Sequence, residues 1–383
     1  MPTALLAGAF GQRNPGDEAL LTSFTDALPG WTTIVPAANP AAVADRRGRA
    51  IPSTAPDALS AALAADAVIF AGGTVFKTLA PSTGRHRHAL LARGIALARG
   101  ARVLGRPVAL VGVGAGLLPD RRARLLARTL ATSADMLVLR DEASAQILAD
   151  AGVPQPMRIG ADAAWTLFAP RAGSSGSADR PGRGPLVVTL SRHAGGAQHV
   201  PTLAAGIAEL LASRTDVDEV VLEPWQVGGP EHGDDLELAR EMRRALRVAA
   251  RMDVTIAPPP ESVRAASASY RQARVVLGQR FHSLVAAAAA GTPFVAFAHE
   301  AKCAALAGRL GQQSLRPGGA IRDVAPTIAR ALDGPPPDRA DVSGLVHTAE
   351  TMLELMRSVV ERGTGGYPHD LRALRLEPEA LLR

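Results

Sequence analysis

The hydrophobic pattern in the first half of the chain alternates between short apolar runs and longer segments with a helical period. Four runs lack the in-and-out alternation of a half-buried strand and are typical of a parallel sheet covered on both faces: residues 3–10, 67–73, 107–116 and 135–140. Segments 86–104 and 120–133, which lie between them, have the period of helices. Because crossovers between parallel strands are right-handed, this pattern predicts a doubly wound α/β domain over residues 1–170.

A segment without any period separates this pattern from its repetition. Residues 171–185 are rich in Gly, Ser and Pro, which predicts a linker. A second doubly wound domain is expected over residues 186–340, because four further strand signals follow: residues 186–191, 217–224, 273–279 and 292–298. The tail, residues 341–383, predicts two helices, 343–361 and 370–382, and adds no strand. The predicted fold is therefore α/β, with two Rossmann-like domains facing a cleft.

Length and composition agree with a soluble two-domain protein. The chain has 383 residues, of which 47% are hydrophobic and 20% charged. It contains no uninterrupted apolar run of the roughly 20 residues that a membrane span needs. The start lacks a basic region with a cleavage site, and the one cysteine, Cys303, cannot form an intrachain disulfide. These features predict a cytoplasmic protein.

The positive charge is carried almost entirely by arginine. The formal net charge is +6, and only Lys77 and Lys302 among the 42 basic residues are lysines. Each lysine is either present by chance or stands where a compact ammonium group is needed. Aromatic residues, which stack on bases, make up 3% of the chain, and nucleic acid is not an expected partner. The Arg-rich helix faces at 120–128 and 240–251 are interpreted as solvated surfaces, with contact to an anionic membrane as the alternative.

The loops that follow strands hold the candidate site residues, because ligands bind beyond the carboxyl ends of parallel strands. In the loop "GAFGQRNPGDEALL" at 8–21, Asn14 suits a helix cap, and Asp17 and Glu18 suit the first turn of a helix. The glycines of this loop, including Gly16, equally allow a ligand hydroxyl or an anion to approach the backbone. Both interpretations stay open for this loop.

Glycines and a cation follow other strands of the first domain. Gly72 and Gly73, and the glycine cluster at 112–118, permit either tight turns or the close approach of a ligand. Arg140 stands before a helix whose dipole opposes its charge. It is therefore expected to pair with Asp141 or with an anionic ligand.

A second group of cations stands at two neighbouring strand ends of the second domain. The stretch "GQRFHSLVAAAAAGTPFVAF" at 278–297 places Arg280 and His282 ahead of an alanine-rich helix, in which alanine permits close packing on the sheet. The next strand ends in "HEAK", which brings His299 and Lys302 to the same edge. A lone histidine at such a place is often structural, but three types of cation at one edge favour an anionic substrate.

Seven motifs follow one another between residues 8 and 302: "NPGDEAL", "GGT", "GVGAGLL", "RDEAS", "GADAAW", "RFHSLVAAAAAGTP" and "HEAK". In this order they resemble the polysaccharide pyruvyl transferase family. The resemblance implies a GT-B-like pair of Rossmann-type domains and the transfer of pyruvate from phosphoenolpyruvate to a sugar as a ketal. It implies phosphoenolpyruvate and a sugar or lipid-linked glycan as partners, in the biosynthesis of cell-wall or exported polysaccharide. No cofactor and no metal are expected.

The resemblance also implies roles for individual residues. Arg140, Arg280 and Lys302 match cationic positions of the family, and Arg192 matches another one loosely, so these residues are expected to bind phosphoenolpyruvate in the cleft. His282 matches the family's histidine and is expected to act as general acid, as general base, or as both. The expected residues of the acceptor side are Asn14, Gly16, Asp17, Glu18, Gly72 and Gly73.

Some positions depart from the family pattern, chiefly "AGGTVFKTLAP" at 71–81, Phe281, and "HEA" before Lys302. These departures put the acceptor in doubt more than the donor. Two alternatives stay open for the function. One is a GT-B glycosyltransferase that uses a nucleotide sugar, with Glu300 or the Glu223 of "EPW" binding the ribose. The other is a catalytically inert protein of the same fold that binds a sugar or an anion.

Overall fold

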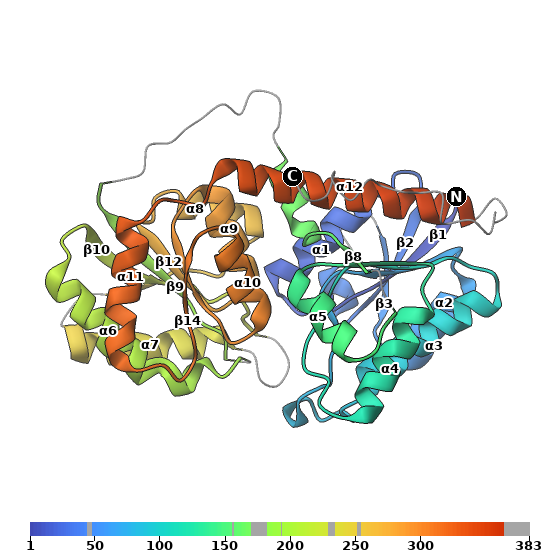
Figure 1. Cartoon of the computed structure of the whole chain (residues 1–383), viewed down its shortest axis with the longest axis horizontal. Helices are drawn as coiled ribbons and strands as arrows, with labels where there is room; N and C mark the ends of the chain where they lie inside the picture. The colour runs from blue at the N-terminus through green and yellow to red at the C-terminus, as the bar shows by residue number, and fades with distance from the viewer. Residues whose placement is uncertain are drawn as a thin grey trace. The chain divides into compact units, whose positions relative to one another are not determined.

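The computed structural model describes residues 1–43, 48–154, 157–169, 182–192, 194–228, 234–250 and 254–363. The chain divides into two compact units (Figure 1). The first unit comprises Met1–Gln12, Asp17–Thr166 and the described residues from Gly344 onward, and the second comprises Arg13–Gly16 and the described part of Leu167–Ser343. These units differ from the expected ranges because residues 13–16 group with the second unit and the C-terminal helix groups mainly with the first.

The first unit is built on one parallel sheet with the strand order β3-β2-β1-β4-β6-β7-β8, and β5 pairs with β6. Its strands are β1 (Thr3–Ala7), β2 (Thr32–Ala37), β3 (Gly48–Pro52), β4 (Ala67–Ala71), β5 (Thr74–Phe76), β6 (Val108–Ala115), β7 (Met136–Leu139) and β8 (Arg158–Ile159). Its α-helices are α1 (Pro15–Asp26), which starts in residues of the second unit, α2 (Ala55–Ala64), α3 (Ala89–Val103), α4 (Arg121–Thr132) and α5 (Glu142–Asp150). Three short 3-10 helices complete it: η1 (Pro40–Ala42), η2 (Pro81–Thr83) and η3 (Ala163–Phe168).

The second unit is built on a second parallel sheet, with the order β11-β10-β9-β12-β13-β14. Its strands are β9 (Gly184–Thr189), β10 (Val217–Leu222), β11 (Val254–Ile256), β12 (Val275–Gly278), β13 (Phe294–Phe297) and β14 (Gln313–Leu315). Its helices are η4 (Gly196–His199), α6 (Val200–Ser213), α7 (Asp235–Ala250), α8 (Val263–Tyr270), α9 (Phe281–Ala290), α10 (Ala301–Arg309), η5 (Ile321–Asp323) and α11 (Val324–Asp333). The last helix, α12 (Arg339–Gly363), continues into the first unit. No helix in the described part of the chain is long and apolar enough to cross a membrane.

Each predicted apolar run forms a strand, so the prediction of two Rossmann-like parallel-sheet units is confirmed. The runs are apolar throughout because helices cover both faces of each sheet, and β4, for example, is buried at every position. In the first sheet, carboxylates fix the strand starts: Asp66 accepts a hydrogen bond from Thr3 N at 2.9 Å, and Asp135 accepts one from Val108 N at 2.9 Å.

The alanine-rich segment forms the buried helix α9, as predicted. Ala286, Ala287 and Ala288 are at most 2% exposed, because their small side chains let the helix approach its neighbours closely. The helix stops at Gly291, whose φ of 72° lies in the left-handed region that favours glycine.

Two further predictions concern the chain ends of the second unit. Most of the predicted linker 171–185 lies outside the described residues, and its last residues belong to β9, which begins at Gly184. The predicted helix 343–361 is present within α12, whereas the predicted helix 370–382 lies outside the described residues.

Candidate functional site

The second sheet has its topological switch point between β9 and β12. The strands that follow β9 in the chain, β10 and β11, lie to one side of it, and those that follow β12 lie to the other. The loop after β9 carries Arg192, the loop after β12 carries Arg280, and the residues after β13 include His299 and Lys302. Because parallel strands end at one edge, these residues share the carboxyl edge of one sheet, where open α/β sheets bind ligands.

Arg280 is held by a buried carboxylate that the sequence prediction did not include. Its Nε lies 3.0 Å from Asp235 Oδ2, and its Nη2 lies 2.9 and 2.7 Å from the two carboxylate oxygens. Its Nη1 donates a hydrogen bond to Gln226 Oε1 at 3.2 Å. The Asp235 side chain is 0% exposed, and the Arg280 side chain is 14% exposed. A bidentate pair of this kind fixes the plane and the direction of the guanidinium.

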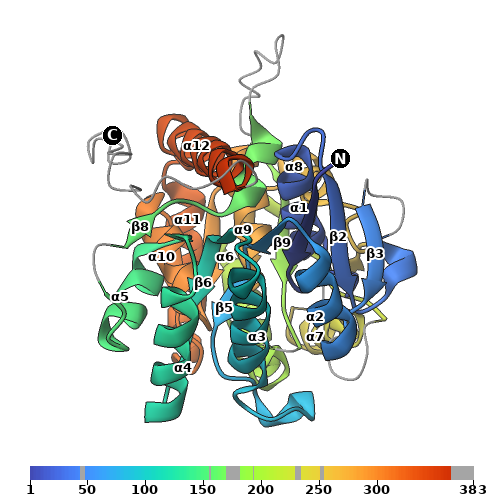
Figure 2. The same cartoon turned by 90° about the vertical axis from the view of Figure 1, so that its right-hand side faces the viewer.

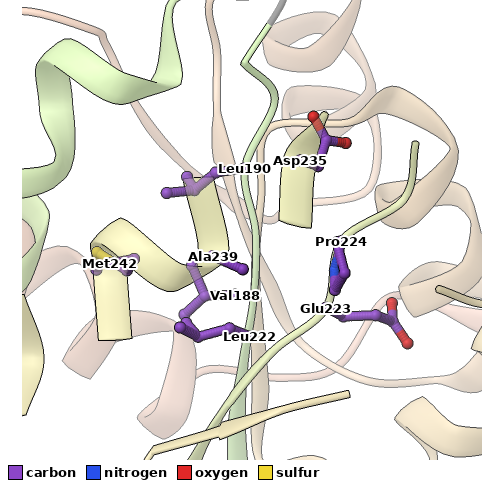
Figure 3. Close-up of a pocket in the computed structure, with 8 residues that line it drawn as sticks. All are labelled: Val188, Leu190, Leu222, Glu223, Pro224, Asp235, Ala239 and Met242. Carbon is purple, nitrogen blue, oxygen red and sulfur yellow. The ribbon is translucent and has the colours of Figure 1, made fainter. Parts of the chain in front are cut away.

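Asp235 also connects the loops that meet at the switch point. Its Oδ1 accepts a hydrogen bond from Arg192 N at 3.1 Å, and its Oδ2 accepts one from Gln226 N at 3.1 Å. Figure 3 shows Asp235 on α7 and Pro224 on the chain after β10, both lining one pocket. The chain segments after β9, β10 and β12 are therefore held together by one carboxylate.

Asp235 combines burial with a neighbouring cation, and the two have opposite effects on its pKa. Burial raises the pKa of Asp235, and the neighbouring Arg280 guanidinium lowers it only in part. A raised pKa means that the folded protein disfavours the ionised form, so the stability contribution of this group falls as the pH rises above the ordinary value of 3.8. A buried carboxylate with a shifted pKa, beside an arginine at the carboxyl edge of a sheet, is typical of functional sites.

Arg192 pairs with a carboxylate farther along α7. Its Nη2 donates a hydrogen bond to Glu241, and its side chain is 32% exposed. Its Nε is buried and makes no hydrogen bond within the described part of the chain. Arg192 therefore retains a donor for an additional acceptor.

His299 follows β13, and Lys302 is the second residue of α10. Lys302 Nζ forms an ion pair with Glu300 and lies 5.9 Å from the centre of the Phe281 ring. Burial lowers the pKa of His299; Glu300 opposes the shift, while Lys302 and Arg280 add to it. A neutral imidazole among cations is the expected state of His299 near neutral pH. The described residues offer its buried Nδ1 no hydrogen-bond partner.

His282 is the second residue of α9 and lies against Gly16, which belongs to the same unit. An ideal Cβ built on Gly16 would lie 1.9 Å from His282 Nδ1 and 2.4 Å from its Cγ. The backbone of Gly16 is not among those with positive φ, so its conformation alone would accept alanine. Gly16 is therefore glycine because the imidazole of His282 needs the space.

Gly16→Ala is expected to displace the His282 ring and to lower the rate of the reaction that depends on it by about 10²-fold, since misplacing a reacting group by about 1 Å has that effect. Gly308→Ala is the control, because a Cβ there meets nothing within 4 Å. Steady-state kinetics and a crystal structure of Gly16→Ala check the prediction. An unmoved ring with an unchanged rate would contradict it.

Arg140 lies in the first unit, whereas Arg192, Arg280 and Lys302 lie in the second. It is 5% exposed; its Nε lies 3.2 Å from Asp141 Oδ2 and its Nη1 lies 3.4 Å from Asp162 Oδ2. The expected pairing with Asp141 is thus present. A Cβ on Gly114 would lie 2.4 Å from Arg140 Nη2, so this glycine leaves room for the guanidinium. A role of Arg140 in binding the donor stays a prediction.

The predicted acceptor residues divide between the two units. Asn14 and Gly16 belong to the second unit, and Asn14 Oδ1 accepts a hydrogen bond from Gly16 N at 3.1 Å, as expected for a helix cap. Asp17 and Glu18 lie in the first turn of α1, in the first unit, and Glu18 Oε1 accepts a hydrogen bond from Gly11 N at 2.9 Å. The local structural roles of this loop are therefore present, and its role toward an acceptor stays a prediction.

Gly72 and Gly73 follow β4 at the switch point of the first sheet. Their φ values of 70° and 71° lie in the left-handed region, and Gly73 O accepts a hydrogen bond from Gly114 N at 2.7 Å. A Cβ on Gly73 would meet nothing within 4 Å. The turn conformation therefore explains the glycines, and the space beside Gly73 leaves the backbone accessible.

Glu223 of the "EPW" motif is buried in a polar network. Its Oε2 accepts a hydrogen bond from Trp225 Nε1 at 2.8 Å and another from the Tyr270 hydroxyl. Burial raises the pKa of Glu223, although both hydrogen bonds lower it in part. The network fastens the chain after β10 to α8, and this chain segment includes Gln226, the partner of Arg280. Glu223 therefore stabilises the chain segment that carries Gln226, and its carboxylate is engaged within the protein.

No group of three or more His, Cys, Asp or Glu side chains that could hold a metal ion occurs among the residues that the structure describes. Arg192, Arg280 and Lys302, with their carboxylate partners, lie at the carboxyl edge of the second sheet. They can bind an anion and move protons.

Comparisons with known proteins agree with this fold and extend it. The family model described as polysaccharide pyruvyl transferase matches residues 14–300. A search of curated proteins gives no significant match. Among solved structures, the UDP-GlcNAc 2-epimerase from Methanocaldococcus jannaschii has a TM-score of 0.60 at 12% identity and covers 94% of this chain and 100% of its own.

Two further solved structures are similar over comparable lengths. The UDP-GlcNAc 2-epimerase from Neisseria meningitidis bound to UDP-GlcNAc has a TM-score of 0.59 at 11% identity, covering 94% of this chain and 100% of that one. Anabaena HepE in complex with UDP-glucose has a TM-score of 0.58 at 12% identity, covering 95% and 99%. At such identities the likeness shows the fold alone, which is the GT-B fold.

Proposed function

We propose that this chain, which belongs to the polysaccharide pyruvyl transferase family, transfers pyruvate from phosphoenolpyruvate to a sugar as a ketal and releases phosphate. The observation that carries the proposal is the group of cations at the carboxyl edge of the second sheet, Arg192, Arg280 and Lys302, each held by a carboxylate. Phosphoenolpyruvate carries a carboxylate and a phosphate, and fixed guanidinium groups bind both well.

The reaction needs one proton to be delivered and two to be removed. Protonation of C3 of phosphoenolpyruvate makes C2 electrophilic, and a first sugar hydroxyl adds to C2 and loses its proton. The bond between C2 and the phosphate oxygen then breaks, and phosphate leaves with the electron pair. A second hydroxyl of the sugar adds to C2 and loses its proton, which closes the ketal. One of the two hydroxyl protons replaces the proton taken up by C3, and the other leaves with phosphate.

His282 is proposed to move these protons, as acid at C3 or as base at a hydroxyl. Its position on the first turn of α9, next to Arg280, is what supports this role. Arg280 is proposed to hold the donor during the transfer and to stabilise the charge that develops on phosphate. Arg192 and Lys302 supply the remaining charge.

The acceptor is proposed to be a sugar of a glycan or of a lipid-linked intermediate. We assign to it the accessible backbone at Gly72 and Gly73 and the polar groups of Asn14, Asp17 and Glu18. We assign Gly16 a different part, which is to leave space for His282. The protein is proposed to work in the cytoplasm, with peripheral contact to the inner face of the membrane.

Transfer of a sugar from a nucleotide sugar is the second candidate, because solved proteins of similar fold are bound to UDP-GlcNAc and UDP-glucose. Such a donor usually needs a carboxylate for its ribose hydroxyls. Glu223 is buried against Trp225 and Tyr270, and Glu300 forms an ion pair with Lys302. Neither carboxylate favours this second function.

Thermal unfolding in the presence of each donor distinguishes the two functions. A ligand that binds only the native protein raises its apparent stability by mass action. We expect phosphoenolpyruvate to raise the melting temperature of the wild type, and to raise that of Lys302→Ala less. Uridine, guanosine and thymidine nucleotide sugars are expected to have no effect. Stabilisation by a nucleotide sugar and not by phosphoenolpyruvate would overturn the proposed donor.

A further inference from the structure

Positive charge is concentrated in one stretch of the first unit. Residues 77–132 contain eleven basic side chains and one acidic side chain, Asp120. The stretch therefore has a formal charge of +10, and since the whole chain has +6, all other residues together have −4. The positive charge is therefore unevenly distributed along the chain. Such an excess attracts anionic surfaces.

Three parts of this stretch lie side by side in the structure. Thr78 N donates a hydrogen bond to Leu117 O at 3.4 Å, which joins the segment after β5 to the segment after β6. Arg87 forms an ion pair with Asp120 at 3.4 Å, and Asp120 caps α4 by accepting a hydrogen bond from Ala123 N at 2.7 Å. We call the surface formed by Lys77, Arg85, Arg87, Leu117 and the exposed side of α4 the basic face.

The basic face exposes leucine among its arginines. Leu117 is 83% exposed and Leu125 is 63% exposed. Arg121, Arg122 and Arg124 on α4 are exposed beside them, while the opposite side of α4 packs against the core. Figures 1 and 2 show α4 on the outside of the first unit, next to α3. Exposing large apolar side chains to water is unfavourable, so a partner that covers them gains free energy.

The second arginine-rich helix face, on α7, differs in its acidic residues. Val248 is as exposed as Leu117, at 83%. However, Glu237 pairs with Arg240, and Glu241 pairs with Arg192, so part of the positive charge of α7 is neutralised. Of the two arginine-rich surfaces, the basic face has the larger excess of charge and the larger exposed side chains.

We infer that the basic face binds the surface of a membrane that contains anionic lipids. Its arginines contact the negatively charged headgroups, and Leu117 and Leu125 enter the interface between headgroups and acyl chains. Residues 77–132 contain no Phe, Tyr or Trp to stack on bases, and a nucleic acid has no apolar layer to cover the leucines. This inference rests on the peripheral membrane contact proposed above and names the surface that makes it. It does not depend on the identity of the donor.

Sedimentation of the full chain with lipid vesicles tests the inference separately from catalysis. The vesicles consist either of phosphatidylcholine alone or of phosphatidylcholine with phosphatidylglycerol, at low and at high salt. We expect binding to the anionic vesicles only, and weaker binding at high salt because exposed charges are then screened. We expect Leu117→Asp, and the double variant Arg121→Gln with Arg122→Gln, each to weaken binding roughly tenfold.

Matched variants on α7 serve as controls. Val248→Asp, and Arg243→Gln with Arg244→Gln, are expected to bind the anionic vesicles as the wild type does. Equal binding to both kinds of vesicle, no binding to either kind, or an equal loss in the α7 variants would overturn the inference. If the wild type bound heparin but neither kind of vesicle, the partner of the basic face would be a soluble polyanion and not a membrane. Thermal stabilisation by phosphoenolpyruvate is unaffected by any of these outcomes and reports on the donor alone.

Discussion

His282→Ala is expected to lose between about 10²- and 10⁴-fold in the rate of ketal formation, which is the range of general acid–base catalysis. The loss is expected in kcat, with little change in the affinity for phosphoenolpyruvate. The physical reason is that the anionic donor is held by Arg192, Arg280 and Lys302, whereas the histidine acts only when protons move. Kinetics of phosphate release, together with calorimetric titration of the donor, measure the two effects separately.

His347→Ala is a suitable control, because His347 is exposed on α12 and lies in the first unit. It is expected to keep the full rate. If His282→Ala weakened donor binding as strongly as it lowered the rate, His282 would be a binding residue and not the proton carrier. An inert sugar-binding or anion-binding protein would show no phosphate release even in the wild type.

Asp235→Asn is expected to lower kcat/KM by about 10²-fold while leaving the protein folded, because the carboxylate that fixes Arg280 is replaced by a neutral amide. The variant is also expected to lose stability, because Arg280, whose side chain is 14% exposed, is left without its anionic partner. Burial raises the pKa of Asp235, so removing the ionised carboxylate offsets part of that loss at neutral pH. Kinetics and denaturant unfolding of the same preparation check both parts.

The other end of the same sheet supplies a matched control in Asp216. Its two carboxylate oxygens accept hydrogen bonds from Arg214 at 2.9 Å each, and Oδ2 also accepts one from Arg274 at 2.7 Å. Hydrogen bonds from Arg214, followed by that from Arg274, hold the pKa of Asp216 well below its ordinary value, although desolvation opposes them. This carboxylate therefore stabilises the fold above pH 3.8, and the stability is lost as the pH falls through its lowered pKa.

Asp216→Asn is expected to lower stability without lowering activity. It should lower the free energy of unfolding by about 1–2 kcal/mol, the range for hydrogen bonds to a charged group that is partly solvated, and keep kcat/KM. Both residues are aspartates paired with arginine in one unit, one before β10 and one beyond its carboxyl end. If both variants lost stability and activity in parallel, Asp235 would be a structural residue and not one that positions Arg280.

The strands that could be predicted from the sequence are those buried along their whole length. Strands such as β4 and β12 are buried at every position, so their apolar runs are visible without any structure. The strands that were not predicted lie mostly at or near sheet edges. β3 contains Arg49 and Pro52, and β11, β14 and β8 have three residues or two. Short or polar edge strands carry too little hydrophobic pattern to be recognised.

The sequence also placed Arg280, His282 and Lys302 at one edge, because each follows a strand end. It did not identify Asp235, although Asp234 and Asp235 open a helix. Carboxylates in the first turn of a helix are ordinary partners of the helix dipole, and nothing in the local pattern shows that this one is fully buried beneath an arginine 45 residues later. Pairing over such a distance in the chain is a property of the folded sheet.

The reason for a glycine at position 16 could not be predicted from the sequence either. Its place in "NPGDEAL" suggested backbone contact with a ligand, whereas the structure places the His282 ring where its Cβ would be. The glycine is needed because a side chain at position 16 would clash with His282, which lies far away in the sequence. Only the three-dimensional contact distinguishes this reason for a glycine from a turn or a ligand site.

The central claim is that phosphoenolpyruvate is the donor and that its C2 becomes a ketal carbon. The most direct measurement incubates the protein with phosphoenolpyruvate labelled with ¹³C at C2, a UDP-sugar, and a panel of glycosides with neighbouring free hydroxyls, followed by NMR. The account predicts that the vinyl carbon signal is replaced by a ketal carbon signal, with one phosphate released for each ketal. Consumption of the UDP-sugar by the same glycosides, with the vinyl signal unchanged, would contradict it.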